Sequence, residues 1–415
     1  MTGPDPVTVR YGPADRRYAL VAGGGTAGHL QPALAIAEAL VARGHDRTSI
    51  EFLGSERGQD AATLSGRGFP VTLLPGRGIV RSLAPKDLVR NARSACELVV
   101  AVVRGVGAVG RARPRVVVAV GGYASLAGAV GALAHRVPLV LVNVDAVPGA
   151  ANRLLGPFAR ASAVGWEGNP LPRAVVTGTP VRPEIATADR SPEGRAAARR
   201  ELGLPEDRAL VVVFGGSLGA RQVNRALDGA ARRWADRDDL AIYHIVGRRD
   251  WSAYGYDPAV ERVVGAGGPG VGDGGAGPAD GVGPGHLDLV RVAYEQRMAT
   301  VYAAADVVVC RAGAMTVAEL AAAGAPSVLV PLPGAPGDHQ TANARVLERA
   351  GAAVLLPDPD CTPAGLASVV EGLLAEPGRL AAMGAAAKAV GRPDAADAGA
   401  AVVEANARPA ERGTR

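Results

Sequence analysis

The chain alternates short, continuously apolar runs with alanine- and leucine-rich runs of helical length. In its first half, apolar runs at residues 18–23, 49–54, 114–122 and 137–144 predict strands. Residues 32–44 predict a helix with proline in its first turn and glycine just past its end. Strands that are apolar at every position are buried on both faces, as in a parallel sheet covered by helices. The pattern therefore predicts an α/β fold.

The same pattern begins again near residue 208. It predicts further strands at residues 208–216, 240–247, 305–313 and 326–334. It predicts helices at residues 221–235 and 314–324. We expect two Rossmann-like domains with parallel sheets, at residues 1–180 and 196–390, joined by a linker at 181–195. The glycine-rich residues 264–286 predict a disordered surface loop inside the second domain, and residues 391–415 form the last helix end and a tail.

The composition excludes several classes of protein. A chain of 415 residues can build two cores, and its cysteines (Cys96, Cys310 and Cys361) are too far apart for a disulfide framework or a structural zinc site, so we expect them to be buried and reduced. Aromatic residues make up only 4% of the chain, which disfavours stacking of single-stranded nucleic acid, and we expect no nucleic-acid partner. No apolar run is long enough for a membrane span or follows basic residues as in a signal peptide.

The motif GGGTAGH (Gly23–His29) lies between a predicted strand and a predicted helix. Glycines at this position let the backbone approach a phosphate, and the helix N-terminus favours an anion. His29 closes the motif and could act as a general base toward a hydroxyl. The spacing also matches the dinucleotide motif, which needs an acid near the end of the second strand. Only Glu56 is available there, so a nicotinamide-dependent oxidoreductase stays an alternative.

Three further motifs follow predicted strands in the second half. GGSLGA (215–220) and RAGAMTVAEL (311–320) each precede or open a helix, whose first N–H groups can bind an anion. Glu319 lies one turn into the second of these helices, where a carboxylate could accept both hydroxyls of a ribose. GDHQTANA (337–344) predicts a loop on which Asp338, His339 and Gln340 point outward.

These blocks together resemble the MurG family over residues 18–395. The resemblance is carried, in order, by GGGTAGHLQPALAIAEAL, VAVGGYASLAG, PGAANRLLG, TGTPVR, VFGGSLGARQVN, YAAADVVVCRAGAMTVAELAAAG and NARVLERAGAAVLL. It implies a GT-B fold, in which two Rossmann-like domains face each other across a cleft and the last helix returns to the first domain. It also implies inverting transfer of N-acetylglucosamine from UDP-GlcNAc to undecaprenyl-diphosphate-linked N-acetylmuramyl-pentapeptide in peptidoglycan synthesis. No metal and no other cofactor is expected.

The resemblance assigns roles to individual residues. His29 is the catalytic candidate. UDP-GlcNAc binding is assigned to Thr26, Ala27, Gly28, Asp145, Arg182, Gly216, Ser217, Ala314, Met315, Thr316, Glu319, His339 and Gln340. The backbone at 245–247 and Met298 would border the uracil. The acceptor side is assigned to Gly23, Gly24, Gly25, Gly121, Gly122 and Tyr123.

One segment predicts attachment to the cytoplasmic face of the plasma membrane. Apolar and basic residues are mixed there, which suits binding to an anionic leaflet. These residues are Ile79, Val80, Arg81, Leu83, Lys86 and Arg90. An ordinary amphipathic helix packed on the core is the alternative.

The segment VNVDAVPG departs from the family pattern. Val142, Asn143 and Asp145 stand where the family has His, Glu and Asn. This change makes the acceptor the open question, so a MurG-like enzyme acting on another lipid or natural product is an alternative. A paralogue that binds a UDP-sugar without catalysis is another.

Overall fold

A computed structural model describes residues 17–24, 27–56, 63–64, 66–75, 85–216, 219–255, 262–264 and 287–409, with the side chains of 85–96 left aside. Contacts divide the chain into two units. The first comprises Met1–Val142, Ala151–Ser162 and Ala400–Arg415, and the second comprises Asn143–Ala150 and Ala163–Gly399. The domain limits expected at residues 180 and 196 stay predictions, because a division by contacts does not show which segment folds independently.

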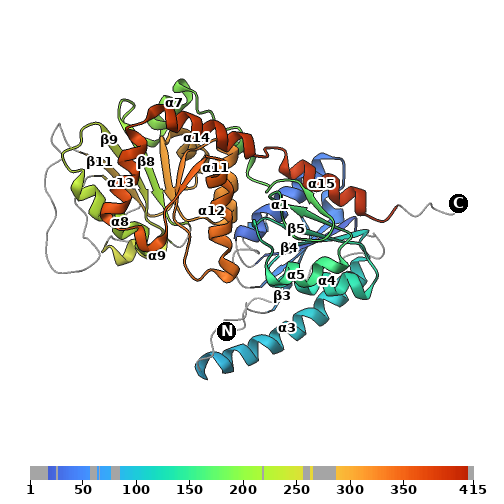
Figure 1. Cartoon of the computed structure of the whole chain (residues 1–415). Coiled ribbons are helices and arrows are strands. Elements are labelled where there is room, and N and C mark those ends of the chain that lie inside the picture. Colours follow the sequence, from blue (N-terminus) through green and yellow to red (C-terminus); the bar gives the residue numbers. More distant parts are fainter. Residues whose placement is uncertain are drawn as a thin grey trace. The chain divides into compact units, whose positions relative to one another are not determined.

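The first seven strands form one sheet in the order β3-β2-β1-β4-β5-β6-β7 (Figure 1). The strands are β1 (Ala19–Gly23), β2 (Ile50–Ser55), β3 (Val71–Leu74), β4 (Val116–Gly121), β5 (Leu139–Asn143), β6 (Ala161–Val164) and β7 (Ala174–Val176). The helices along this part of the chain are α1 (Ala27–Ala42), α3 (Pro85–Ala112), α4 (Tyr123–Ala134) and α5 (Ala150–Leu155). Strands β1, β2, β4 and β5 are buried at every position, as expected for a sheet covered on both faces.

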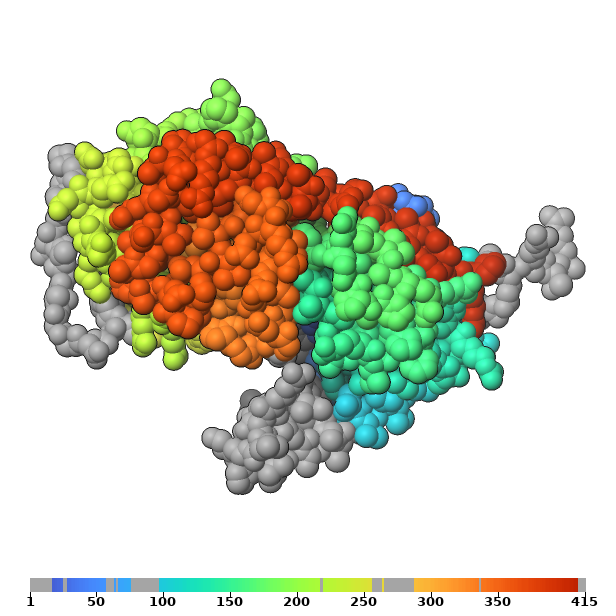
Figure 2. All heavy atoms as spheres, viewed as in Figure 1, coloured from blue at the N-terminus to red at the C-terminus, as the bar shows by residue number. Residues whose placement is uncertain are grey.

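The second sheet has the order β10-β11-β9-β8-β12-β13-β14. Its strands are β8 (Ala209–Phe214), β9 (Leu240–Ile245), β10 (Arg262–Val264), β11 (Asp288–Val292), β12 (Val307–Cys310), β13 (Ser327–Leu329) and β14 (Ala353–Leu355). The helices along the rest of the chain are α6 (Pro183–Ala186), α7 (Pro192–Leu202), α8 (Arg221–Arg233), α9 (Arg248–Ala253), α10 (Met298–Ala304), α11 (Ala314–Ala323), α12 (His339–Arg349), α13 (Pro363–Leu374), α14 (Pro377–Val390) and α15 (Ala395–Asn406). Figure 2 shows α13 and α14, in red, on the outer surface of the second unit.

The sheets confirm the predicted Rossmann-like fold class, with two local differences. Helix α1 begins at Ala27, five residues before the predicted start, so Pro32 lies inside it and cannot donate to the carbonyl of Gly28. Strand β10 pairs antiparallel with β11, whereas only parallel strands were predicted. An antiparallel edge strand needs no helical crossover, so the chain can reach it through a loop. The glycine-rich segment follows β10, and residues 265–286 lie outside the described residues.

Two cysteines confirm the expected burial, since Cys310 and Cys361 are buried free thiols, and burial raises the pKa of Cys361 to about 11. Within the part of the chain that the structure describes, no helix has the length and apolar character that a membrane crossing requires.

The part of helix α15 from Ala400 on packs within the first unit. Glu404 of α15 receives hydrogen bonds from Arg43 and His45 at the end of α1, and Val403 is fully buried. Figure 1 shows α15 beside α1 in this unit.

Candidate functional site

The first unit gathers its predicted site residues where the strand order reverses. Strands β3 and β2 lie on one side of β1, and the chain then continues on the other side with β4. Ligands of open α/β sheets bind at such a switch point, beside the carboxyl ends of the strands. Gly23 ends β1 and pairs with Gly121, which ends β4. The structure therefore brings together GGGTAGH and VGGYAS, two motifs nearly 100 residues apart in the sequence.

The ring of His29 lies against the backbone that follows β4. A Cβ at Gly121 would lie 2.8 Å from His29 Nδ1, and a Cβ at Gly122 would lie 2.6 Å from the carbonyl of Gly24. Both glycines also have positive φ, at 113° and 79°. Glycine is therefore required at both positions, for space and for backbone conformation. His29 and the two glycine loops form one compact arrangement.

Two side chains hold this arrangement in place. The buried hydroxyl of Ser125 accepts from the Gly121 N–H at 2.7 Å and donates to the carbonyl of Ala22 at 2.7 Å. The hydroxyl of Tyr123 donates to the carbonyls of Pro75 and Glu97, so this side chain anchors the start of α4. Sequence reasoning missed Ser125, whose only signal is a small polar residue in the first turn of an apolar helix.

Several predicted residues of this unit lie outside the described part of the chain. They are Gly25 and Thr26 of the glycine motif and Ile79, Val80, Arg81 and Leu83 of the membrane segment. Lys86 and Arg90 lie in α3, and their side chains are not described. Ala27 and Gly28 open α1.

The second unit has an equivalent switch point between β8 and β12. After β8, the chain turns back so closely that a Cβ at Gly215 would lie 2.3 Å from the backbone nitrogen of Ala220. Gly216 follows with a φ of 89°, and Ser217 lies outside the described residues. Helix α8 then begins at Arg221 without a side-chain cap. Its first N–H groups face the loop, as an anion site at a helix start requires.

A buried network of polar side chains lies beside the loop between β8 and α8. The side-chain amide of Asn224 donates to the carbonyl of Val246 at 3.1 Å and to Asp250 at 3.2 Å, and its oxygen contacts His244 Nε2 at 3.0 Å. Burial, aided by the nearby Arg291, lowers the pKa of His244 well below its usual range, so this ring is neutral. The network fixes the carbonyl of Val246, in the segment predicted to border the uracil.

The second loop of this unit connects β12 to α11. Gly313 is the N-cap of α11 and provides no side chain, so Ala314, Met315 and Thr316 present the start of the helix. Arg311 precedes it and donates to Asp358 and to the carbonyls of Val330 and Pro331. The start of α11 is thus held by the contacts of Arg311, which comes just before Ala312 and Gly313.

Glu319 has two partners from other elements. The hydroxyl of Tyr302 donates to Glu319 Oε2 at 2.9 Å, and Arg182 Nη2 lies 3.7 Å from Glu319 Oε1. Burial raises the pKa of Glu319, while Arg182 and the Tyr302 hydrogen bond oppose that rise. Arg182, predicted near the diphosphate, therefore lies beside the predicted ribose-binding carboxylate. Tyr302 was missed, because nothing in an apolar helix pattern marks one tyrosine as a partner of Glu319.

The motif GDHQTANA was predicted as a loop with outward side chains, and this prediction was wrong from His339 on and for the direction of Gln340. His339 and Gln340 begin α12, while Asp338 is its N-cap with a left-handed backbone. The amide oxygen of Gln340 accepts from the N–H groups of Ala312 at 3.2 Å and Leu332 at 2.9 Å. A helix forms here because the following residues, TANARVLER, have the apolar spacing of one helical face.

Asp145 lies against α12 in the second unit. Its carboxylate accepts from the amide of Asn343 at 3.0 Å, and the fully buried Asn343 also accepts from the N–H of Ala146 at 2.7 Å. The altered VNVDAVPG segment is therefore held by direct hydrogen bonds. Asn343 was missed because an asparagine inside a helix pattern gives no sign of a distant partner.

The described residues contain no group of three histidine, cysteine or acidic side chains placed to hold a metal ion.

Comparison with known proteins defines the class to which this fold and these sites belong. Residues 19–164 match the glycosyltransferase family 28 N-terminal domain, and residues 210–398 match the glycosyltransferase family 28 C-terminal domain. The structure resembles Acinetobacter baumannii MurG with a TM-score of 0.69 at 24% identity, covering 94% of this chain and all of that one. It also resembles the calicheamicin glycosyltransferase CalG4, with a TM-score of 0.60 at 17% identity, covering 95% of this chain and 98% of that one. The fold is thus that of a GT-B glycosyltransferase.

Curated relatives identify the family. A protein of Desulforudis audaxviator is 36% identical over 405 residues, covering 95% of this chain and 99% of its own length. A protein of a Nocardioides species is 39% identical over 374 residues, covering 89% of this chain and 93% of its own length. Both are named UDP-N-acetylglucosamine–N-acetylmuramyl-(pentapeptide) pyrophosphoryl-undecaprenol N-acetylglucosamine transferase. The chain belongs to the MurG family of family 28 glycosyltransferases.

Proposed function

We propose that this protein transfers N-acetylglucosamine from UDP-GlcNAc to N-acetylmuramyl-pentapeptide linked to undecaprenyl diphosphate. The observation that carries the proposal is the second unit's arrangement of two uncapped helix starts, α8 and α11, with Glu319 one turn into α11. It offers N–H groups for a diphosphate and a carboxylate for a ribose diol. The names of the relatives supply the identity of the sugar and the acceptor.

We infer an inverting displacement at the anomeric carbon. The acceptor hydroxyl attacks C1 as the bond from C1 to the UDP oxygen breaks, and His29 takes the hydroxyl proton. The departing diphosphate gains negative charge, which the N–H groups at the starts of α8 and α11 stabilise, with Arg182 near the nucleotide. His29 suits this role because its ring is held against Gly121 and Gly122, in a loop cluster predicted to bind the acceptor diphosphate.

We propose that no metal takes part, since helix starts and Arg182 can stabilise the leaving group. Activity should be unchanged when EDTA is added and when magnesium or manganese is then restored. Loss of activity with EDTA and recovery with one of these ions would contradict the proposal.

We further propose that the enzyme works at the cytoplasmic face of the plasma membrane. The support is the sequence of residues 79–90, where apolar and basic residues alternate, and the lipid acceptor in the relatives' names. Flotation with vesicles containing phosphatidylglycerol tests this proposal. Substitution of Arg81, Lys86 and Arg90 by glutamate should abolish co-flotation.

One observation favours a second acceptor class. Asp145 stands where the resemblance places the family's asparagine, and its carboxylate accepts from the side-chain amide of Asn343. The deciding assay uses labelled UDP-GlcNAc and a short-chain lipid I analogue, with disaccharide product as the readout. Product formed well above hydrolysis of UDP-GlcNAc supports the proposed reaction. Tight donor binding without product would shift the proposal to another lipid or a natural product.

The donor site is tested at Glu319. Substitution Glu319→Ala should abolish detectable UDP-GlcNAc binding in calorimetry, because the ribose loses its acceptor. Glu319→Gln keeps the shape and should weaken binding by roughly 10-fold or more, as expected for loss of charge-assisted hydrogen bonds. Glu348→Ala, an exposed glutamate on α12, is the matched control and should bind normally. Unchanged affinity in Glu319→Ala would overturn the donor-site assignment.

A further inference from the structure

A cavity of about 420 Å³ lies in the second unit, at the end of the sheet opposite the donor loops. Two of its lining residues, Asp306 and Pro326, directly precede β12 and β13, so the cavity lies at the amino ends of these strands. The donor loops follow the carboxyl ends of β8 and β12. The cavity is therefore separate from the candidate donor site.

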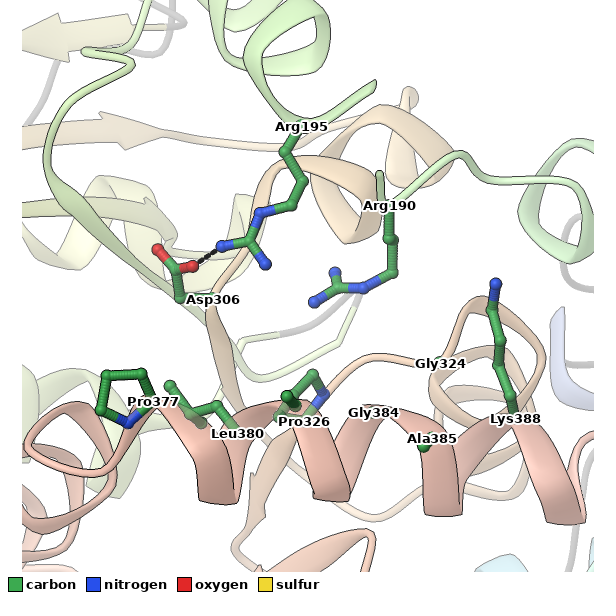
Figure 3. Close-up of a pocket in the computed structure, with 11 residues that line it drawn as sticks. Arg190, Arg195, Asp306, Gly324, Pro326, Pro377, Leu380, Gly384, Ala385 and Lys388 are labelled. Carbon is green, nitrogen blue, oxygen red and sulfur yellow. Dashed lines mark ion pairs between the residues drawn. The ribbon is translucent and has the colours of Figure 1, made fainter. Parts of the chain in front are cut away.

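The cavity gathers positive charge from two walls. Arg190 lies just before α7 and Arg195 lies near the start of that helix, and Lys388 extends from α14 on the opposite wall (Figure 3). Asp306 is the one carboxylate among the lining residues. It pairs with Arg195 and is shared with Arg199, whose Nη2 lies 2.7 Å away. The Asp306 carboxylate thus already pairs with two arginines. Arg190 and Lys388 add two further positive charges to the same region.

Arg190 is partly buried, and its hydrogen-bond partners are backbone carbonyls. Its guanidinium donates to the carbonyls of Tyr302 and Ala305, and it forms no ion pair with any residue that the structure describes. Burial, with Arg195 and Arg199 nearby, lowers the pKa of Arg190 to about 10, so the group stays charged at neutral pH. Partial burial removes water from this charge, and an anion in the cavity would offset that lost solvation.

Lys388 is held so that its amino group can reach the same space. Its aliphatic chain packs on Gly324, where a Cβ would lie 2.6 Å from Lys388 Cγ. Gly324 ends α11 in a left-handed conformation that only glycine adopts without strain. Asp189 interacts electrostatically with Lys388, and its carboxylate accepts from the backbone N–H of Ser191.

We propose that this cavity binds a small, free, phosphate-bearing anion between Arg190, Arg195 and Lys388. Arginine presents N–H groups in a planar fork that matches phosphate oxygens, and lysine adds a mobile point charge. The proposal does not depend on the donor site, because neither helix start that would hold UDP contributes to the cavity.

The test is calorimetric titration of the full chain with inorganic phosphate and with pyrophosphate, at constant ionic strength set with chloride and with saturating UDP, which occupies the helix starts of α8 and α11. Wild-type protein should bind one of these anions at one site per chain. Lys388→Glu should weaken that binding about 10-fold or more, through lost attraction and added repulsion. Arg379→Glu, an exposed arginine of α14 outside the cavity, should bind like wild type.

Arg195→Gln is a second variant, since it keeps Arg190 in place and should also weaken binding. Circular dichroism confirms that each variant is folded. Absence of binding in wild type, equal binding in Lys388→Glu, or equal weakening in Arg379→Glu would overturn the proposal. Binding to phosphatidylglycerol vesicles without binding of either free anion would overturn it too, since the ligand would then be a lipid headgroup. UDP-GlcNAc binding is measured separately, so failure here is distinguishable from failure of the proposed function.

Discussion

At the scale of single residues, the candidate donor site depends on the environment of one carboxylate. Glu319 must be ionised to accept two ribose hydroxyls, yet its burial favours the neutral form. Arg182 and the hydroxyl of Tyr302 counteract that effect. The sequence identified Glu319 and Arg182 separately, each from its own motif, but gave no reason to place them together.

This environment predicts a pH dependence. Because the pKa of Glu319 is raised, UDP-GlcNAc binding should fall as the pH decreases through that pKa and should be full above it. Arg182→Gln removes a positive charge that lowers the pKa, so the fall should move to higher pH. Calorimetric affinity measured from pH 5 to pH 8.5 checks this, and Arg392→Gln, at an exposed arginine, is the control. An identical profile in Arg182→Gln would contradict the assigned electrostatic role.

At the scale of elements, glycine allows the tight turn between strand β8 and helix α8. Gly215 lies where β8 turns toward α8, and there is no space for a methyl group beside Ala220. The strands and helices flanking these turns could be predicted from apolar patterns. The start of helix α12 could not be predicted, because His339 and Gln340 are polar and only the contacts of Gln340 with Ala312 and Leu332 show that they are held in place.

Gly215→Ala should therefore move the start of α8. We expect a loss of about 1–3 kcal/mol in the free energy of unfolding, as for other overpacked sites, together with weaker donor binding. Gly372→Ala, in α13, is the matched control, because its added methyl group would contact nothing within 4 Å. The control should be neutral or slightly more stable, since alanine favours a helix. Urea unfolding and UDP-GlcNAc titration measure both effects.

At the scale of the whole molecule, pattern reasoning predicted two α/β units and the class of each sheet. It could not predict the pairing of Asp145 with Asn343, nearly 200 residues away, because a single sequence shows no long-range contact. Nor could it predict the antiparallel β10, which is only three residues long. The return of helix α15 to the first unit was implied by family resemblance and not by composition.

The burial of Val403 in the first unit predicts a localised effect. Val403→Asp places an unpaired carboxylate in that core and should cost at least ~3 kcal/mol. Hydrogen exchange should accelerate in β1 and β4 and stay unchanged in β8 and β12. Glu404→Gln, on the partly exposed neighbour, should cost about 1 kcal/mol or less. Equal acceleration in both sheets would show that α15 does not stabilise the first unit specifically.

The division of the chain also has a consequence for the order of events during synthesis. The first unit includes the part of α15 that begins at Ala400, so the ribosome makes nearly all of the second unit before the first can be complete. Translation runs from the N-terminus at about 5–20 residues per second, so the early sheet waits tens of seconds for α15. The unit that begins first is therefore the unit that finishes last.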